Sequence, residues 1–139
     1  MNLFLDANII VSVVNKEYPI FTYSARVLGL TEDKRFQLYT TPLSLAIAFY
    51  FSSKKSGQDA AKKKMQFLSQ KLKIAESKQD DIYEAAHNKK IHDFEDGLQY
   101  YAAVRAGCKC IITEDTDDFY FSGIEVLNSE AFLKKYVFS

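Results

Sequence analysis

The chain has 139 residues, a length that suits one domain, and we expect residues 1–139 to form a single domain. Its 47% hydrophobic and 26% charged residues, with only five Gly and two Pro, exclude collagen-like, linker and low-complexity chains. Eighteen basic and eighteen acidic residues give a formal net charge of zero. This balance argues against nucleic-acid binding by bulk charge, but it allows separate patches of opposite sign.

The predicted elements alternate between strands and helices along the chain. In order, we expect a strand at 2–5, a helix at 20–30, a strand at 36–40, helices at 42–53 and 59–72, a strand at 72–75, helices at 79–88 and 94–106, strands at 108–113 and 124–127, and a helix at 129–136. Helix 42–53 is apolar almost all round, which predicts a buried helix. Strands separated by helices imply an α/β fold, a three-layer α/β/α sandwich with a mostly parallel central sheet.

The two cysteines, Cys108 and Cys110, are one residue apart, which on a strand places both side chains on one face. A disulfide between them would close a strained loop, so we expect small buried hydrophobes in a reducing cytoplasm. His87 and His92 lack the spacing of a zinc site. The apolar N-terminus has no basic start and contains Asp6, so we expect neither a signal peptide nor a membrane span.

Acidic residues follow two of the predicted strands. Asp6 ends the first strand with Asn8 two residues later, and Asp115, Asp117 and Asp118 come just after strand 108–113. Ligands of parallel sheets bind beyond the carboxyl ends of the strands. If these two strands are neighbours, Asp6 and Asp115 converge at one edge of the sheet.

A third acidic group, Asp93, Glu95 and Asp96, begins helix 94–106. Crowded carboxylates repel one another, and a hard divalent cation such as Mg²⁺ or Mn²⁺ removes that cost. Such a cation can polarise a phosphodiester and activate water. Local explanations also exist: Asp93 and Asp96 have the spacing of a helix capping box, and the acids after strand 108–113 could be ordinary turn residues. Asp6 is harder to explain locally because it interrupts an apolar run.

Two segments, LDANII and DFEDGLQYYAAVRAGCKCIITEDTDDF, resemble motifs of the PIN domain, a small metal-dependent ribonuclease fold found in many toxins of toxin–antitoxin modules. The resemblance covers essentially the whole chain. It implies that Asp6, Asp96 and Asp115 are catalytic residues that bind Mg²⁺ or Mn²⁺. Thr113 and Asp118 match recurrent positions beside the last acid. We expect these two residues to support the site, together with Asn8 and Asp93.

One position departs from the family pattern. Family members usually carry Glu on the helix after the second strand, and Ile47 stands there in this chain. Isoleucine cannot bind a metal, so either Asp93, Glu95 or Asp118 compensates, or the activity is weak or lost. Thr41 and Ser44 are near enough in sequence to offer a hydroxyl instead.

Basic residues concentrate in the middle of the chain, between positions 54 and 78. Phosphate contacts dominate nucleic-acid affinity, so this flank is a candidate for holding RNA. The residues expected to bind RNA are Lys54, Lys55, Lys62 and Lys63. The alternative is a solvated helix face that contributes only solubility.

The acidic residues together with the PIN resemblance favour a Mg²⁺-dependent endoribonuclease, and the resemblance implies that it is the toxin of a type II toxin–antitoxin module. The resemblance further implies a homodimer and a cognate antitoxin, with RNA as the substrate. A rival hypothesis is a PIN-fold binding module without nuclease activity, which Ile47 favours. A second rival is a phospho-acceptor domain of the receiver type, which a lone Asp on the first strand disfavours.

Overall fold

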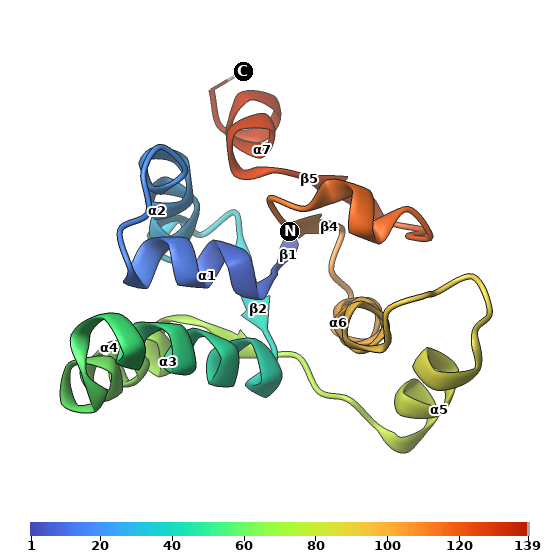
Figure 1. Cartoon of the computed structure of the whole chain (residues 1–139). Helices are drawn as coiled ribbons and strands as arrows, with labels where there is room; N and C mark the ends of the chain where they lie inside the picture. The colour runs from blue at the N-terminus through green and yellow to red at the C-terminus, as the bar shows by residue number, and fades with distance from the viewer. Residues whose placement is uncertain (139) are drawn as a thin grey trace.

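The structure, a computed structural model, describes residues 1–138, which contain one five-stranded sheet (Figure 1). Its strand order is β3-β2-β1-β4-β5, and every neighbouring pair is parallel. The strands are β1 (Asn2–Leu5), β2 (Gln37–Thr40), β3 (Lys73–Ile74), β4 (Cys110–Ile112) and β5 (Glu125–Leu127). The expected parallel sheet is therefore confirmed, with β1 at its centre.

Helices cover both faces of this sheet. Within residues 1–138 they are α1 (Ala7–Val14), α2 (Phe21–Gly29), α3 (Pro42–Ser56), α4 (Gln58–Lys71), α5 (Gln79–His87), α6 (Phe94–Arg105) and α7 (Ser129–Tyr136), with short 3₁₀ segments at Leu30–Glu32 and Thr116–Phe119. Leu3 and Leu5 of β1 pack into a larger apolar cluster, and Phe4 packs into a second one. Since alternate strand residues point to opposite faces, these two clusters form the two interfaces of the predicted three-layer sandwich. None of the helices in the described part is long and apolar enough to cross a membrane.

Helix α1 is the main element that the sequence patterns did not predict. Its residues, ANIIVSVV, are rich in β-branched side chains, which have low helix propensity. Asp6 nevertheless caps the helix, because its side chain accepts a hydrogen bond from the Ala7 amide. Ile9, Ile10 and Val14 are buried against the sheet. Tertiary packing thus overrides local propensity here and turns the chain immediately after β1.

The expectation that helix 42–53 is buried was wrong. This segment forms the first part of α3, and the buried residues of α3 are only Ser44, Ala48 and Ser52, which recur every four residues along one face of the helix. This narrow face of small side chains lets α3 approach α1 closely. The large side chains lie on the other faces, and Phe51 is 46% exposed.

The two cysteines are buried and free, as expected, but they do not share a face. Cys110 belongs to the larger apolar cluster and Cys108 to the other one. The strand begins only at Cys110, because Gly107, with a φ of 72°, ends α6 and Cys108 lies in the turn that follows. The alternation of a strand therefore does not apply between the two residues. Burial raises the pKa of each thiol to about 12, so both remain protonated and unreactive.

Candidate functional site

Four side chains meet where β1 and β4 end, and we call Asp6, Asn8, Thr113 and Asp115 the strand-end group. The parallel pairing of β1 with β4 brings these two ends together. The Thr113 hydroxyl donates to Asp6 Oδ2 at 2.8 Å and accepts from the Asp115 backbone amide at 3.1 Å. Asn8 Nδ2 donates to Thr113 Oγ1 at 3.1 Å and to Asp115 Oδ2 at 3.2 Å. The predicted convergence of Asp6 and Asp115 is thus confirmed, and Thr113 and Asn8 hold them.

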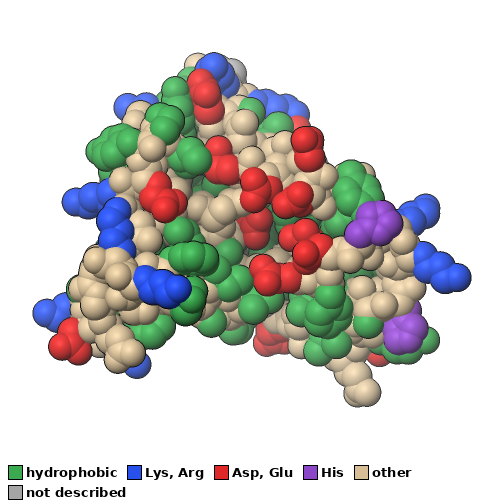
Figure 2. All heavy atoms as spheres, viewed as in Figure 1, with side chains coloured by type: hydrophobic (Ala, Val, Ile, Leu, Met, Phe, Trp, Pro, Cys, Tyr) green, Lys and Arg blue, Asp and Glu red, His purple; other side chains and the backbone are tan. Residues whose placement is uncertain are grey.

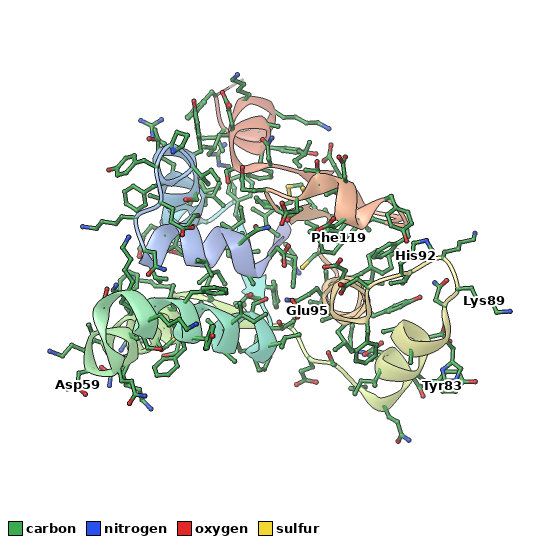
Figure 3. The ribbon with its side chains drawn as sticks, viewed as in Figure 1. Asp59, Tyr83, Lys89, His92, Glu95 and Phe119 are labelled. Carbon is green, nitrogen blue, oxygen red and sulfur yellow. The ribbon has the colours of Figure 1, made fainter. Side chains whose placement is uncertain are left out.

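Three acids at the start of α6 form the helix-end group, Asp93, Glu95 and Asp96. Asp93 is the N-cap residue, and its side chain accepts from the Asp96 amide at 3.0 Å. This is one half of the predicted capping box, and the reciprocal bond from Asp96 is not found within residues 1–138. Figure 3 shows Glu95 at the start of α6, on the side of that helix that faces α1 and β1.

The strand-end and helix-end groups line a single cavity of about 410 Å³. Its lining residues are Asp6, Ala7, Asn8, Val11, Glu17, Ile47, Phe51, Asp93, Glu95, Asp96, Asp115 and Asp118. Thr113, the fourth member of the strand-end group, is fully buried and does not line the cavity, and Asp117 does not line it either. Figure 2 shows the same pattern at the surface: acidic side chains gather in the centre of this face, while Lys and Arg lie around its edge.

Burial and crowding disturb two of these carboxyl groups. Burial is the main cause that raises the pKa of Asp6, and the charges of Asp115 and Glu95 add to it against the two hydrogen bonds that Asp6 accepts. Burial is also the main cause that raises the pKa of Asp96 to about 7, followed by the charges of Asp93 and Asp6. The cavity therefore carries a surplus of negative charge that its own lining does not balance.

The donor set of this cavity fits a hard divalent cation, because all of its candidate ligands are oxygen atoms. No three His, Cys, Asp or Glu side chains within residues 1–138 form a ready-made cage around one ion. Mg²⁺ is commonly held by one or two carboxylates and keeps several waters. Asp6 and Asp115, which share Thr113 as a hydrogen-bond partner, fit that mode of binding.

Ile47 lines the same cavity as Asp96, at the place where the family pattern has Glu. The hydroxyls of Thr41 and Ser44 do not compensate for it, so that expectation was wrong. Thr41 Oγ1 donates to Gln99 Oε1 at 2.6 Å, and Gln99 Nε2 donates to Ser44 Oγ at 2.5 Å. All three side chains are buried, and they join the start of α3 to α6.

The lysines predicted to bind RNA serve different local roles in the structure. The Lys55 ammonium donates to the Asn15 carbonyl at the end of α1, and the Lys54 ammonium lies 4.4 Å from the centre of the Tyr50 ring. Lys62 and Lys63 are exposed on α4. None of the four lines the acidic cavity, but Lys54 and Lys55 follow Phe51 by one helical turn. Their role in RNA binding stays a prediction.

Val11, Glu17 and Phe51 line the cavity although the sequence analysis did not select them. Val11 follows Asn8 by three residues on α1, a spacing that places both on one helix face. Phe51 follows Ile47 by four residues on α3 in the same way. If residues 7–14 are assigned to a helix, its periodicity places Val11 beside Asn8. No local pattern in the sequence indicates that Glu17 lines the cavity.

The chain is similar to known proteins along most of its length. Residues 2–117 match the PIN domain family. A similar protein is "Ribonuclease VapC1" of Aquifex aeolicus (strain VF5), which is 27% identical over 137 residues that cover 96% of this chain and 94% of that protein.

Three solved structures have the same fold. VapBC2 from Rickettsia felis bound to a promoter DNA fragment aligns with a TM-score of 0.69 and 18% identity, over 92% of this chain and 98% of that chain. Mycobacterium tuberculosis VapC20, described as a sarcin–ricin loop cleaving toxin, also has a TM-score of 0.69. It is 16% identical, and the alignment covers 89% of this chain and 98% of that chain. VapBC-1 from nontypeable Haemophilus influenzae has a TM-score of 0.68. It is 15% identical, and the alignment covers 94% of this chain and 99% of that chain.

Proposed function

This chain belongs to the PIN domain family, and from that premise we propose that it is an endoribonuclease that hydrolyses RNA phosphodiester bonds with a bound Mg²⁺ or Mn²⁺ ion. The observation that carries the proposal is the convergence of Asp6, Asp96 and Asp115 in one cavity whose lining contains no Lys or Arg among the described residues. A cation is the counter-charge that this cavity needs. The same arrangement suits a reaction at a phosphate group.

Asp6, Asp96 and Asp115 are the residues proposed to hold the ion and to act in catalysis. When bound, the ion supplies charge neutralisation at the phosphate oxygens and lowers the pKa of a coordinated water. Thr113 and Asn8 keep the Asp6 and Asp115 carboxylates in place through the hydrogen bonds described above. Asp93 fixes the first turn of α6, and Asp118 adds a further oxygen donor to the cavity.

The cellular role that we propose is that of the toxin in a type II toxin–antitoxin module. The similarity to VapC1 and the fold shared with VapC20 and two VapBC proteins support this role. A cognate antitoxin would then be its partner, and the acidic cavity would suit a basic side chain of that protein. We also propose a homodimer and, since both buried cysteines are free, a reducing cytoplasm.

The direct test is cleavage of a structured RNA by the purified protein with Mn²⁺ or Mg²⁺, beside the variants Asp6→Asn and Asp96→Asn. We expect cleavage by the wild type and a loss of about 100-fold or more in each variant, because several kcal/mol of charge stabilisation are removed. EDTA should abolish the wild-type activity. Equal cleavage by all three proteins would contradict the proposed site.

A second candidate function is a PIN-fold binding module with little or no nuclease activity. Ile47 supports it, because this side chain places an apolar group where the family pattern has an acid. Under this alternative, no protein in the same assay cleaves RNA, and calorimetry finds no binding of Mn²⁺. Cleavage that depends on Asp6 would exclude it.

A further inference from the structure

Part of the lining of the acidic cavity is apolar, and we call Val11 on α1 with Ile47 and Phe51 on α3 its apolar wall. We propose that this apolar wall is a subsite for one unpaired nucleobase of the RNA, which lies against Phe51 while the adjoining phosphate faces the carboxylates. The proposal rests on the proposed function, since it assigns the substrate class and a specificity determinant to the same site.

Exposure of an aromatic ring inside the cavity is the first argument for this subsite. Phe51 is 46% exposed although it lines a cavity, so one part of its ring remains available for contact. Tyr50 contacts that ring edge-on, with centroids 5.3 Å apart, which restricts its orientation. Every nucleobase has a flat face that stacks on such a ring.

The order of apolar and basic side chains along α3 is the second argument for this subsite. Ile47, Phe51 and Lys55 are four residues apart and therefore share one face of the helix over about 12 Å. Lys54 and Lys55 continue the helix beyond the wall, and Figure 2 shows blue side chains at the edge of the face whose centre is acidic. A nucleotide on the wall would thus have the carboxylates on one side and positive charge on the other.

Two further charged residues, Glu17 and Lys54, indicate where a phosphate of the RNA can lie. Glu17 lines the cavity from the segment after α1 and would repel a phosphate there. The Lys54 ammonium, one helical turn beyond Phe51 on α3, supplies a positive charge outside the cavity for a neighbouring phosphate of the RNA. A cavity of about 410 Å³ is also in the range of small-molecule sites and has room for a nucleotide.

The test measures binding by fluorescence anisotropy with the full-length protein in Ca²⁺. The probes are a labelled single-stranded RNA of about eight nucleotides and a second oligonucleotide of equal length and charge whose central nucleotides are abasic. We expect the wild type to bind the intact RNA about tenfold more tightly than the abasic one, which corresponds to about 1.4 kcal/mol for one stacked base.

Three variants make the test specific for the wall. Phe51→Ala should reduce the ratio of the two affinities to about one, and Phe51→Trp should preserve it. The matched control is Phe67→Ala, which removes a phenylalanine of similar exposure, 52%, from α4 outside the cavity. It should leave the ratio unchanged. Circular dichroism and thermal unfolding of each variant establish that it is folded.

The outcomes separate this inference from the proposed nuclease activity. Equal affinity of the wild type for both probes, no binding of either, or an unchanged ratio in Phe51→Ala would overturn the subsite. Equal affinity would instead favour a protein segment on the wall. If the wild type cleaves RNA in Mn²⁺ but shows no base dependence, only the subsite fails. If it shows base-dependent binding without cleavage, only the nuclease proposal fails.

Discussion

The two acidic ends of the cavity are held in different ways. In the strand-end group, the Asp6 carboxylate accepts hydrogen bonds from the Ala7 amide and the Thr113 hydroxyl, both at 2.8 Å. In the helix-end group, no hydrogen bond to the Asp96 carboxylate is found within residues 1–138. The pKa of Asp96 is raised to about 7, by burial first and then by its acidic neighbours.

This difference indicates that one end of the cavity is preorganised and the other responds to charge. The strand-end group takes its geometry from paired strands, so its carboxylates are fixed before any ligand arrives. Asp96 keeps its place only through the position of α6, which the buried Gln99 joins to α3. A cation, a proton or a nearby substitution should therefore affect the helix end first.

Among substitutions outside the three proposed ligands, the largest effect is expected from Thr113→Val, which breaks the strand-end group. The Thr113 hydroxyl makes three hydrogen bonds, and its loss leaves Asn8 and the Asp115 amide without this partner. We expect the free energy of unfolding to fall by about 2 kcal/mol and RNA cleavage to fall about 10- to 100-fold. Urea denaturation and initial cleavage rates measure the two effects.

The control for this change is Thr22→Val, at an exposed position of α2. It should alter neither quantity measurably. A Thr113→Val protein with wild-type stability and activity would show that the strand-end group does not depend on its hydrogen bonds.

The next effect concerns the support behind the helix end. Gln99→Leu leaves the buried hydroxyls of Thr41 and Ser44 without their partner on α6. We expect the free energy of unfolding to fall by about 1.5 kcal/mol, as measured by urea denaturation. The exposed Gln66 of α4 provides the matched variant Gln66→Leu, which should be nearly neutral. Equal stability of the two variants would contradict a structural role for the buried network.

Ile47→Glu tests the response of the cavity to an added acid. The new carboxylate lies in the same cavity as Asp96, so we expect Mn²⁺ to bind about tenfold more tightly in isothermal titration calorimetry. The exposed Ile82 of α5 supplies the control Ile82→Glu, which should not change Mn²⁺ affinity. An unchanged affinity in Ile47→Glu would mean that this position does not face the bound ion.

The last prediction concerns the pH dependence of stability and needs no RNA or metal ion. Because the pKa of Asp96 lies above its ordinary value of 3.8, the folded state binds this proton more tightly than the unfolded chain. The resulting stabilisation is complete below about pH 3.8 and is lost as the pH rises through about 7. In EDTA, the unfolding temperature of the wild type should therefore fall relative to that of Asp96→Asn over this range. Parallel curves for the two proteins would contradict a raised pKa.

Much of the fold followed from local patterns in the sequence. The strand at Asn2–Leu5 and the helix at Ser129–Tyr136 lie where periodicity and capping residues placed them. The positions of Asp6 and Asp115 after two apolar strands were enough to predict that they meet. Strand ends are visible in a sequence because polar residues interrupt a buried run, and parallel connection then brings those ends to one edge.

Other features depend on contacts between distant segments. No local pattern assigned a helix to Ala7–Val14, because its β-branched residues favour it only when they pack on the sheet. The exposure of Phe51 could not be predicted either, since an apolar helix gives no sign of which face its neighbours will cover. Cys108 was placed on the wrong face because the turn at Gly107 shortens the strand.

The sequence by itself determined the parallel α/β architecture and the meeting of Asp6 and Asp115 at one edge of the sheet, and the family resemblance added Asp96 at the start of a helix. Only the tertiary structure decided how those acids are held: fixed by Thr113 at the strand end, and left without a hydrogen-bond partner at the helix end, within the described residues. It also decided that Ile47 and Phe51 form an apolar wall beside them. The physical reason is that periodicity is a property of neighbouring residues, whereas burial and hydrogen bonding at a site are properties of segments that meet only in the folded chain.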